Sequence, residues 1–232
     1  MPVHIAPRDP RSESATEIPG YAQTSLRWPS QPLVRRPQTL AALSGPREIL
    51  KRLAPVRADL AGEGAKRAIG QLMHLNVRVL DEDGAPVPRA VVELWHCNAA
   101  GKYIHENDTH DAPVDPNFHG AARGVTDAEG RFTLRSIKPA AYPVPDSGKW
   151  WRPPHVHFSV WGKVWLSRLV TQMFFPGEPL NAHDRILNAV RDPEARERCI
   201  ARLLPVEQGP AAALVYEYAM VVRGRNAAPS LP

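Results

Sequence analysis

Residues 71–80 alternate apolar and polar side chains, and this period of two limits the possible folds more than any other feature of the chain. Successive side chains of a β-strand point to opposite faces, so the alternation predicts a strand with one buried face. That face would carry Met73, Leu75, Val77 and Val79. The turn signal at residues 81–84 follows, and residues 91–95 indicate the next strand.

Similar apolar stretches predict further strands. They lie at residues 131–135, 155–161, 168–175 and 213–223. Helical spacing is rarer. We expect one helix from Pro46 to Leu60 with a kink or an end at Pro55, and a second from His183 to Leu203, interrupted near Pro193.

The 25 prolines favour short strands and ordered loops over a helix bundle. We therefore predict an all-β fold, a β-sandwich with few short helices. Residues 1–70 would form an extended N-terminal arm with a short helical segment, and residues 71–232 the β-sandwich domain. With 232 residues, of which 43% are hydrophobic and 23% charged, one well-buried domain is the default expectation.

The formal charge of +5 arises from scattered Lys and Arg residues, and no nucleic-acid-binding motif accompanies them. We therefore expect no nucleic-acid partner, and a surface that tolerates or attracts small anions. Cys97 and Cys199 lie far apart without a Cys-x-x-Cys partner, which excludes a zinc knuckle and fits a reducing compartment. The sequence has neither an apolar signal core nor a membrane-length run, so we expect a cytoplasmic protein without a membrane partner.

The segment Trp151-Arg152-Pro153-Pro154-His155-Val156-His157 ends in an apolar His-x-His. In a strand the two imidazoles share one face, with Cα atoms about 7 Å apart, so they could bind one metal ion. Two ordinary polar side chains remain the alternative. Tyr103 and Tyr142 lie in loop contexts, where a tyrosine by itself indicates packing.

Many separate motifs resemble one family. They are Pro19-Gly20-Tyr21, Pro37-Gln38-Thr39-Leu40, Ser44-Gly45-Pro46, Val92-Glu93-Leu94-Trp95, Gly101-Lys102-Tyr103, His105-Glu106-Asn107-Asp108, Asp115-Pro116-Asn117-Phe118, Ile137-Lys138-Pro139, Trp151 to Phe158, and Val221-Val222-Arg223-Gly224-Arg225. Over nearly its whole length the chain resembles the intradiol ring-cleaving dioxygenases, and among them the protocatechuate-cleaving members. The resemblance implies a catechol and O2 as substrates.

The resemblance also implies a metal centre, one non-haem Fe(III) per chain. Its ligands would be Tyr103, Tyr142, His155 and His157, which stand in the family's order and relative spacing. Phenolate oxygen is a hard anionic donor that suits Fe(III). Tyr142 would be the axial ligand that the catechol displaces, leaving as a phenol with one substrate proton.

Three other residues receive roles from the resemblance. Arg152 would stabilise negative charge on the bound catecholate, and Gln172 would hydrogen-bond near the iron and Arg152. Tyr21 would contact the substrate carboxylate. The alternatives are a surface ion pair for Arg152 and an ordinary strand glutamine. We expect Trp95 in the core and Cys97 as an inert buried thiol.

The chain departs from the family beside the axial ligand. Val144-Pro145 stand where an aromatic and a basic residue are usual, and Ile104 replaces a basic residue. These changes leave ligation intact and concern the ring substituent. Protocatechuate, cleaved to 3-carboxy-cis,cis-muconate in aromatic catabolism, is the leading substrate. A sulfonated catechol and hydroxyquinol are the alternatives.

Two other classes of protein stay open. The sequence of residues 84–95 also resembles that of prealbumin-like β-sandwich modules, which only bind partners. Alternatively, a hydrolase could bind a divalent metal ion through the two histidines and a carboxylate such as Asp184. We expect an oligomer, either with an alpha-type chain or with further copies of this chain, because some family members use two chain types and others one.

Overall fold

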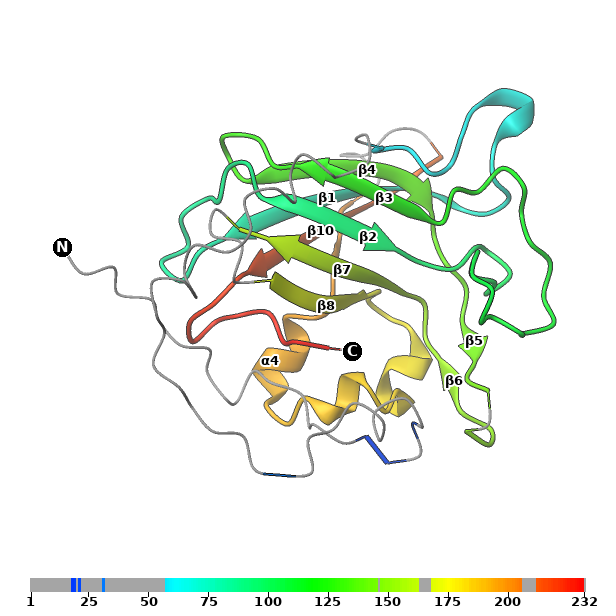
Figure 1. The fold of residues 1–232 in the computed structure, drawn as a ribbon. Coiled ribbons are helices and arrows are strands. Elements are labelled where there is room, and N and C mark those ends of the chain that lie inside the picture. Colours follow the sequence, from blue (N-terminus) through cyan, green and yellow to red (C-terminus); the bar gives the residue numbers. More distant parts are fainter. Residues whose placement is uncertain are drawn as a thin grey trace.

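The computed structural model describes residues 57–145, 147–162, 168–205 and 212–231, together with residues 18, 19, 21 and 31. In these residues the strands form two four-stranded sheets and a two-stranded one (Figure 1). The first sheet has the order β4 (Arg131–Ile137), β1 (Leu72–Leu80), β10 (Leu214–Val221) and β9 (Arg202–Leu203). The second has the order β3 (Ala121–Val125), β2 (Val91–Trp95), β7 (His155–Trp161) and β8 (Arg168–Phe174). The small sheet pairs β5 (Tyr142–Pro143) with β6 (Trp151–Arg152).

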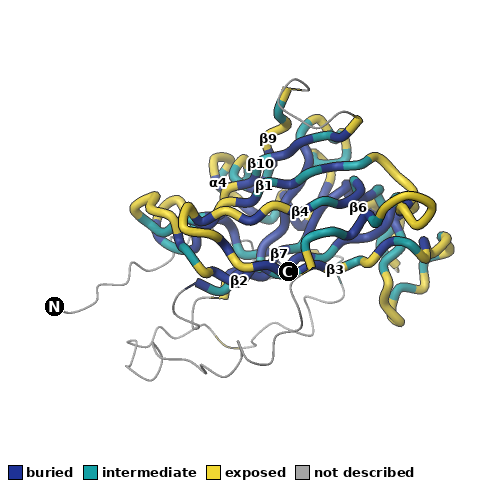
Figure 2. Tube along the Cα trace, turned by 90° about the horizontal axis from the view of Figure 1, so that it is seen from above, coloured by how far each residue is buried: buried dark blue, intermediate teal, exposed yellow. Residues whose placement is uncertain are grey.

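The main core lies between the two large sheets. Every second residue of β1, from Met73 to Val79, is buried, as the alternation predicts. Their partners in the core include Phe158 of β7 and Tyr218 of β10. The buried residues of the strands appear as dark blue segments of the tube in Figure 2. The predicted all-β sandwich is therefore confirmed.

Short helical segments lie beneath β8 in Figure 1. They are the 3-10 turns η3 (Pro179–His183) and η4 (Leu187–Ala189) and the single turn α4 (Pro193–Glu197). The expected helix from His183 to Leu203 is wrong. Asp192 caps a new helix by accepting from the amides of Glu194 and Ala195, so Pro193 starts α4 instead of interrupting a longer helix. Beyond α4 the chain becomes extended and pairs with β10.

The expected helix from Pro46 to Leu60 falls mostly outside the described residues. A helix does not continue from Pro55 to Leu60, because Arg57 and Asp59 form β-bridges with Arg123 and Arg135, so of the two expectations at Pro55 an end fits and a kink does not. Leu60 is fully buried in the main core, so this part of the chain packs on the sandwich. A short 3-10 turn, η2, spans Gly64–Lys66. The boundary at residues 70 and 71 stays a prediction.

Strand β3 was not predicted from the sequence. Its residues, Ala121–Val125, are mostly small and carry little β-propensity. A Cβ on Gly124 would lie 1.9 Å from the ring of Phe132, so the ring of β4 fills the space where a side chain would stand. No helix in the described part of the chain is long and apolar enough to cross a membrane.

Candidate metal centre

Strand β7 places the two histidines at its beginning, after Pro153 and Pro154. His155 pairs with Phe174 of β8, and His157 lies between Gln172 of β8 and Trp95 of β2. As i and i+2 residues they point to one face. Their Nε2 atoms are 3.2 Å apart, so the His-x-His converges on one point.

The tautomer of His155 follows from its neighbours. Its Nδ1 lies 2.7 Å from the carbonyl oxygen of Pro153, which can only accept, so Nδ1 carries the proton and Nε2 the lone pair. Burial first, and then the charge of Arg152, lowers the pKa of His155 well below its usual value and that of His157 to about 3. Both rings are therefore neutral at pH 7, the form that binds metals.

His157 is flanked by an aromatic wall. The ring of Trp95 stacks on it with a centroid distance of 5.0 Å and an interplanar angle of 3°. Trp95 is half-buried and stands outside both apolar clusters, so its expected place in the core is wrong. The strand alternation gives a signal for this, because buried Leu94 requires Trp95 to face the other side of β2.

The β5–β6 hairpin brings the first tyrosine to the histidines. Tyr142 pairs with Arg152 across the hairpin, and its hydroxyl oxygen lies 3.4 Å from Nε2 of His155. Burial raises the pKa of Tyr142, although the nearby Arg152 charge opposes this.

The second tyrosine comes from the loop that follows β2. Asp108 accepts from the backbone N–H of Tyr103 at 2.7 Å and also contacts Lys102. Gly101 has a φ of 80°, and a Cβ there would lie 2.7 Å from the carbonyl oxygen of Ala141. Glycine therefore allows this loop to approach the chain beside Tyr142, and the rings of Tyr103 and Tyr142 meet edge to face at 5.4 Å.

The hydroxyl of Tyr103 is buried and has no hydrogen-bond partner of acceptable geometry. Burial first, and then the neighbouring Tyr142, raises the pKa of Tyr103 well above its usual value. An unsatisfied buried phenol beside two neutral imidazoles costs free energy unless a cation completes the site. Among the described residues no three His, Cys, Asp or Glu side chains group as metal ligands. Two phenols and two imidazoles form the donor set instead, and the hard phenolate oxygens together with the imidazole nitrogens fit Fe(III).

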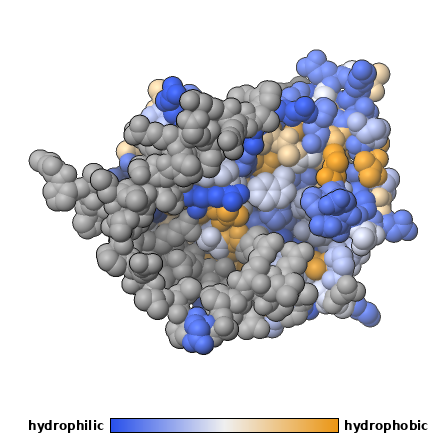
Figure 3. All heavy atoms as spheres, in the orientation of Figure 1, coloured by the Kyte–Doolittle hydropathy of each residue, from blue (hydrophilic) through white to orange (hydrophobic). Residues whose placement is uncertain are grey.

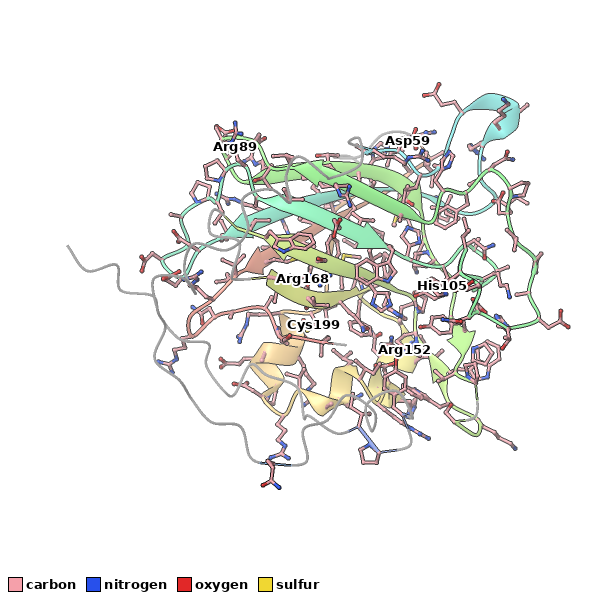
Figure 4. The ribbon with its side chains drawn as sticks, viewed as in Figure 1. Asp59, Arg89, His105, Arg152, Arg168 and Cys199 are labelled. Atoms are coloured by element: carbon pink, nitrogen blue, oxygen red, sulfur yellow. The ribbon has the colours of Figure 1, made fainter. Side chains whose placement is uncertain are left out.

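Arg152 lies beside these donors, at the lower right of the sandwich in Figure 4. Its Nη1 is 2.9 Å from Nε2 of His155, and its Nη2 donates to Oε1 of Gln172 at 2.6 Å. Its Nε donates to Oδ2 of Asp184 at 3.0 Å. Arg152 is 2% exposed, so a surface ion pair does not describe it. Burial alone would lower the pKa of Arg152, but the charges of Tyr142 and Asp184 more than offset this and raise it.

Sequence reasoning missed the contact between Asp184 and Arg152. Asp184 is fully buried, and its side chain accepts from Arg152 and from the backbone N–H of Leu187. This leaves no basis for Asp184 as the carboxylate ligand of a divalent hydrolase. A charged residue at the edge of an expected helix gave no signal for such a contact.

Tyr21 packs against Trp150, two residues before Arg152, with an edge-to-face centroid distance of 5.7 Å. Val144, one of the departures from the family, packs on the same apolar cluster, which also contains Ile18 and Trp150. The structure thus places Tyr21 near the hairpin that carries Tyr142. Its contact with a substrate carboxylate stays a prediction.

Comparison with known proteins identifies the class. Residues 43–224 match the family described as Dioxygenase. The chain is 44% identical over 232 residues to the protocatechuate 3,4-dioxygenase beta chain of Burkholderia cepacia, covering 98% of this chain and 97% of that one. It is 32% identical over 146 residues to catechol 1,2-dioxygenase 2 of Acinetobacter lwoffii, covering 55% of this chain and about half, 51%, of that relative.

Solved structures share the fold. The catechol 1,2-dioxygenase of Pseudomonas arvilla C-1 is similar with a TM-score of 0.51 and 25% identity, over 70% of this chain and 55% of that one. The 3-chlorocatechol 1,2-dioxygenase of Rhodococcus opacus 1CP has a TM-score of 0.53 and 24% identity, over 69% of this chain and 62% of that one. The protein belongs to the intradiol dioxygenases, an iron-dependent family of ring-cleaving enzymes. It is an enzyme of this family, and a prealbumin-like binding module is thereby excluded.

Proposed function

We propose that this chain is the iron-bearing chain of an enzyme that cleaves protocatechuate with O2, between the two hydroxyl groups, to 3-carboxy-cis,cis-muconate. The observation that carries the proposal is the convergence of Tyr103, Tyr142, His155 and His157 from three separate segments of the chain. The 44% identical relative, a protocatechuate 3,4-dioxygenase beta chain, supports the choice of substrate.

These four side chains would hold one Fe(III), which when bound supplies Lewis-acid chemistry that activates a catecholate toward O2. The two imidazoles are neutral and would bind through nitrogen lone pairs. Each phenol would lose its proton to become an anionic ligand, and the buried setting makes that ionisation depend on the cation.

Tyr142 would act as the internal base. It lies in the short hairpin, and its hydroxyl is 3.4 Å from Nε2 of His155, whereas the hydroxyl of Tyr103 is buried without a hydrogen-bond partner. Tyr142, as a phenolate, would take one proton from a catechol hydroxyl at its own oxygen and become a neutral phenol. The neighbouring Arg152 would face the negative charge of the bound substrate, with Gln172 holding its Nη2.

The ring substituent would be recognised near Tyr21, on the side of the hairpin where Trp150 and Val144 pack. Val144 is smaller than an aromatic residue and Pro145 has no charge, so we expect a wider pocket with weaker carboxylate recognition than in the relatives. Loss of one charge-assisted hydrogen bond costs about 1.5 to 3 kcal/mol.

Steady-state oxygen uptake tests this function. We expect a higher kcat/KM for protocatechuate than for unsubstituted catechol by roughly tenfold or more. Hydroxyquinol and a sulfonated catechol are compared in the same assay. Preference for either of these over protocatechuate would replace the proposed substrate, and preference for plain catechol over every acidic analogue would refute acid recognition.

Assembly and location are part of the proposal. The loop between β2 and β3 exposes the side chains of Ile104 and Val114. Figure 3, in the orientation of Figure 1, shows apolar residues at the surface on the right-hand side of the molecule, where this loop lies. Such side chains suit contact with another chain, either an alpha-type partner or a second copy. Both cysteines are unpaired and buried, which supports a reducing cytoplasm. Light scattering of the chain alone and with an alpha-type chain measures which assembly forms.

A further inference from the structure

The guanidinium of Arg152 has five N–H donors, and their partners divide into two groups. Nε donates to Oδ2 of Asp184 at 3.0 Å, and Nη2 reaches Oδ1 of Asp184 at 3.3 Å and Oε1 of Gln172 at 2.6 Å. These contacts occupy the single donor of Nε and both donors of Nη2. Only Nη1 is directed at the metal centre, where it lies 2.9 Å from Nε2 of His155.

Asp184 is itself fixed from a different part of the fold. Its Oδ1 accepts from the N–H of Leu187 at 2.7 Å, and its backbone carbonyl accepts from the N–H of Asn188 at 3.0 Å. It follows η3 directly, so the helical segment under β8 sets the position of its carboxylate. Both Asp184 and Arg152 are almost completely buried, which leaves this guanidinium few alternative orientations.

We propose that Asp184 is a positioning residue, which rests on the function proposed above: it holds the Nε and Nη2 edge of Arg152 so that the two Nη1 donors face the substrate. A metal on Nε2 of His155 would occupy the lone pair that Nη1 now faces, so that Nη1 could donate to an oxygen of the bound catecholate instead. Removal of one partner of a buried ion pair leaves an uncompensated charge, so the Asp184 variants must be compared at equal folding and iron content. The contacts of Asp184 with Nε and Nη2 fix the direction of Nη1.

The test compares iron-loaded wild type with Asp184→Asn and Asp184→Glu. Asn keeps the size and loses the charge, whereas Glu keeps the charge and moves the carboxylate by one methylene. Asp59→Asn is a control for the same substitution in a partly exposed aspartate–arginine pair, because Asp59 accepts from Arg135 at 2.8 Å. Figure 4 shows Asp59 and Arg152 on opposite sides of the molecule.

Three quantities are measured for each protein: bound iron, the dissociation constant of protocatechuate from an anaerobic titration of the visible band, and kcat from oxygen uptake. We expect both Asp184 variants to retain iron and to lower kcat by about 10- to 100-fold, with a much smaller change in the dissociation constant. The control should keep the wild-type kcat.

Wild-type kcat in a folded, iron-loaded Asp184→Glu protein would overturn the inference, as would a loss of kcat in both variants that only matches their loss of iron. Failure of both variants to fold would assign Asp184 a structural role and overturn it as well. An inactive wild type contradicts the proposed function instead, so the two failures are distinguishable.

Discussion

The Nε2 atoms of His155 and His157 lie 3.2 Å apart, and three polar atoms surround the first of them. They are Nε2 of His157, the hydroxyl oxygen of Tyr142 at 3.4 Å and Nη1 of Arg152 at 2.9 Å. One lone pair cannot satisfy all of these contacts. Convergence of this kind is what a shared cation requires.

Gly101 controls the distance between the two tyrosines. In Gly101→Ala the new Cβ would lie 2.7 Å from the carbonyl oxygen of Ala141 and 3.1 Å from Cβ of Tyr142, so the loop must move away. We expect a loss of roughly 1 to 3 kcal/mol in unfolding free energy and weaker iron binding. Chemical denaturation and iron titration measure these.

Gly84→Ala is the matched control for this variant. Gly84 has the same φ of 80°, but a Cβ there would have no atom within 4 Å. It should show the backbone strain without any change in iron binding. Equal iron affinities in the two variants would contradict the role of Gly101 in placing Tyr103 against Tyr142.

Iron binding should release protons. The raised pKa values of Tyr103 and Tyr142 keep both phenols protonated at pH 7, whereas the lowered pKa values of His155 and His157 leave the imidazoles with no ionising proton to lose. We therefore expect iron affinity to fall as pH falls. Calorimetry in buffers of different ionisation enthalpy counts the protons, and Tyr142→Phe should release about one fewer than wild type. An unchanged count in that variant would argue against Tyr142 as an anionic ligand.

Buried His96 should make the metal-free protein sensitive to acid. Its Nε2 contacts the hydroxyl of Ser136 at 2.9 Å, and burial lowers its pKa to about 4. The unfolded chain binds a proton near pH 6.5 and the folded chain does not, so stability is lost as pH falls from about 6.5 toward 4. His96 alone contributes about 3 kcal/mol to this loss.

His96→Gln isolates this contribution. Denaturant unfolding at pH 7.5 gives the cost of the substitution itself, and the same measurement at pH 4.5 gives the acid-dependent part. We expect a smaller loss between the two pH values in the variant than in wild type. Parallel losses would show that His96 is not held neutral in the folded state.

Local patterns in the sequence predicted the parts of the fold that depend on near neighbours. The alternation in β1 and the His-x-His of β7 need only the period of a strand, and the structure has both. Strand β3 was missed because small residues carry no strand signal, and because the need for Gly124 comes from the ring of Phe132, which lies on a different strand. The prediction of one long helix after His183 was wrong because Asp192 and Pro193 begin a new, short helix.

The candidate site shows the same division. Spacing alone indicated a pair of histidines, and only the family resemblance suggested Tyr103 and Tyr142 as their partners. The contact between the two tyrosine rings depends on the close approach of the loop at Gly101 to the chain beside Tyr142. No periodic pattern in the sequence predicts the path of this loop. The contact of Asp184 with Arg152 spans 32 residues and joins two segments that give no local signal.

The most direct measurement of the central claim is metal analysis of the purified chain together with its visible spectrum. The convergence of Tyr103, Tyr142, His155 and His157 predicts about one Fe(III) per chain and a red-brown colour from phenolate-to-iron charge transfer. Tyr103→Phe should weaken that band, because it removes one of the two phenolates. A colourless protein with stoichiometric zinc after expression in iron-replete medium would contradict the account.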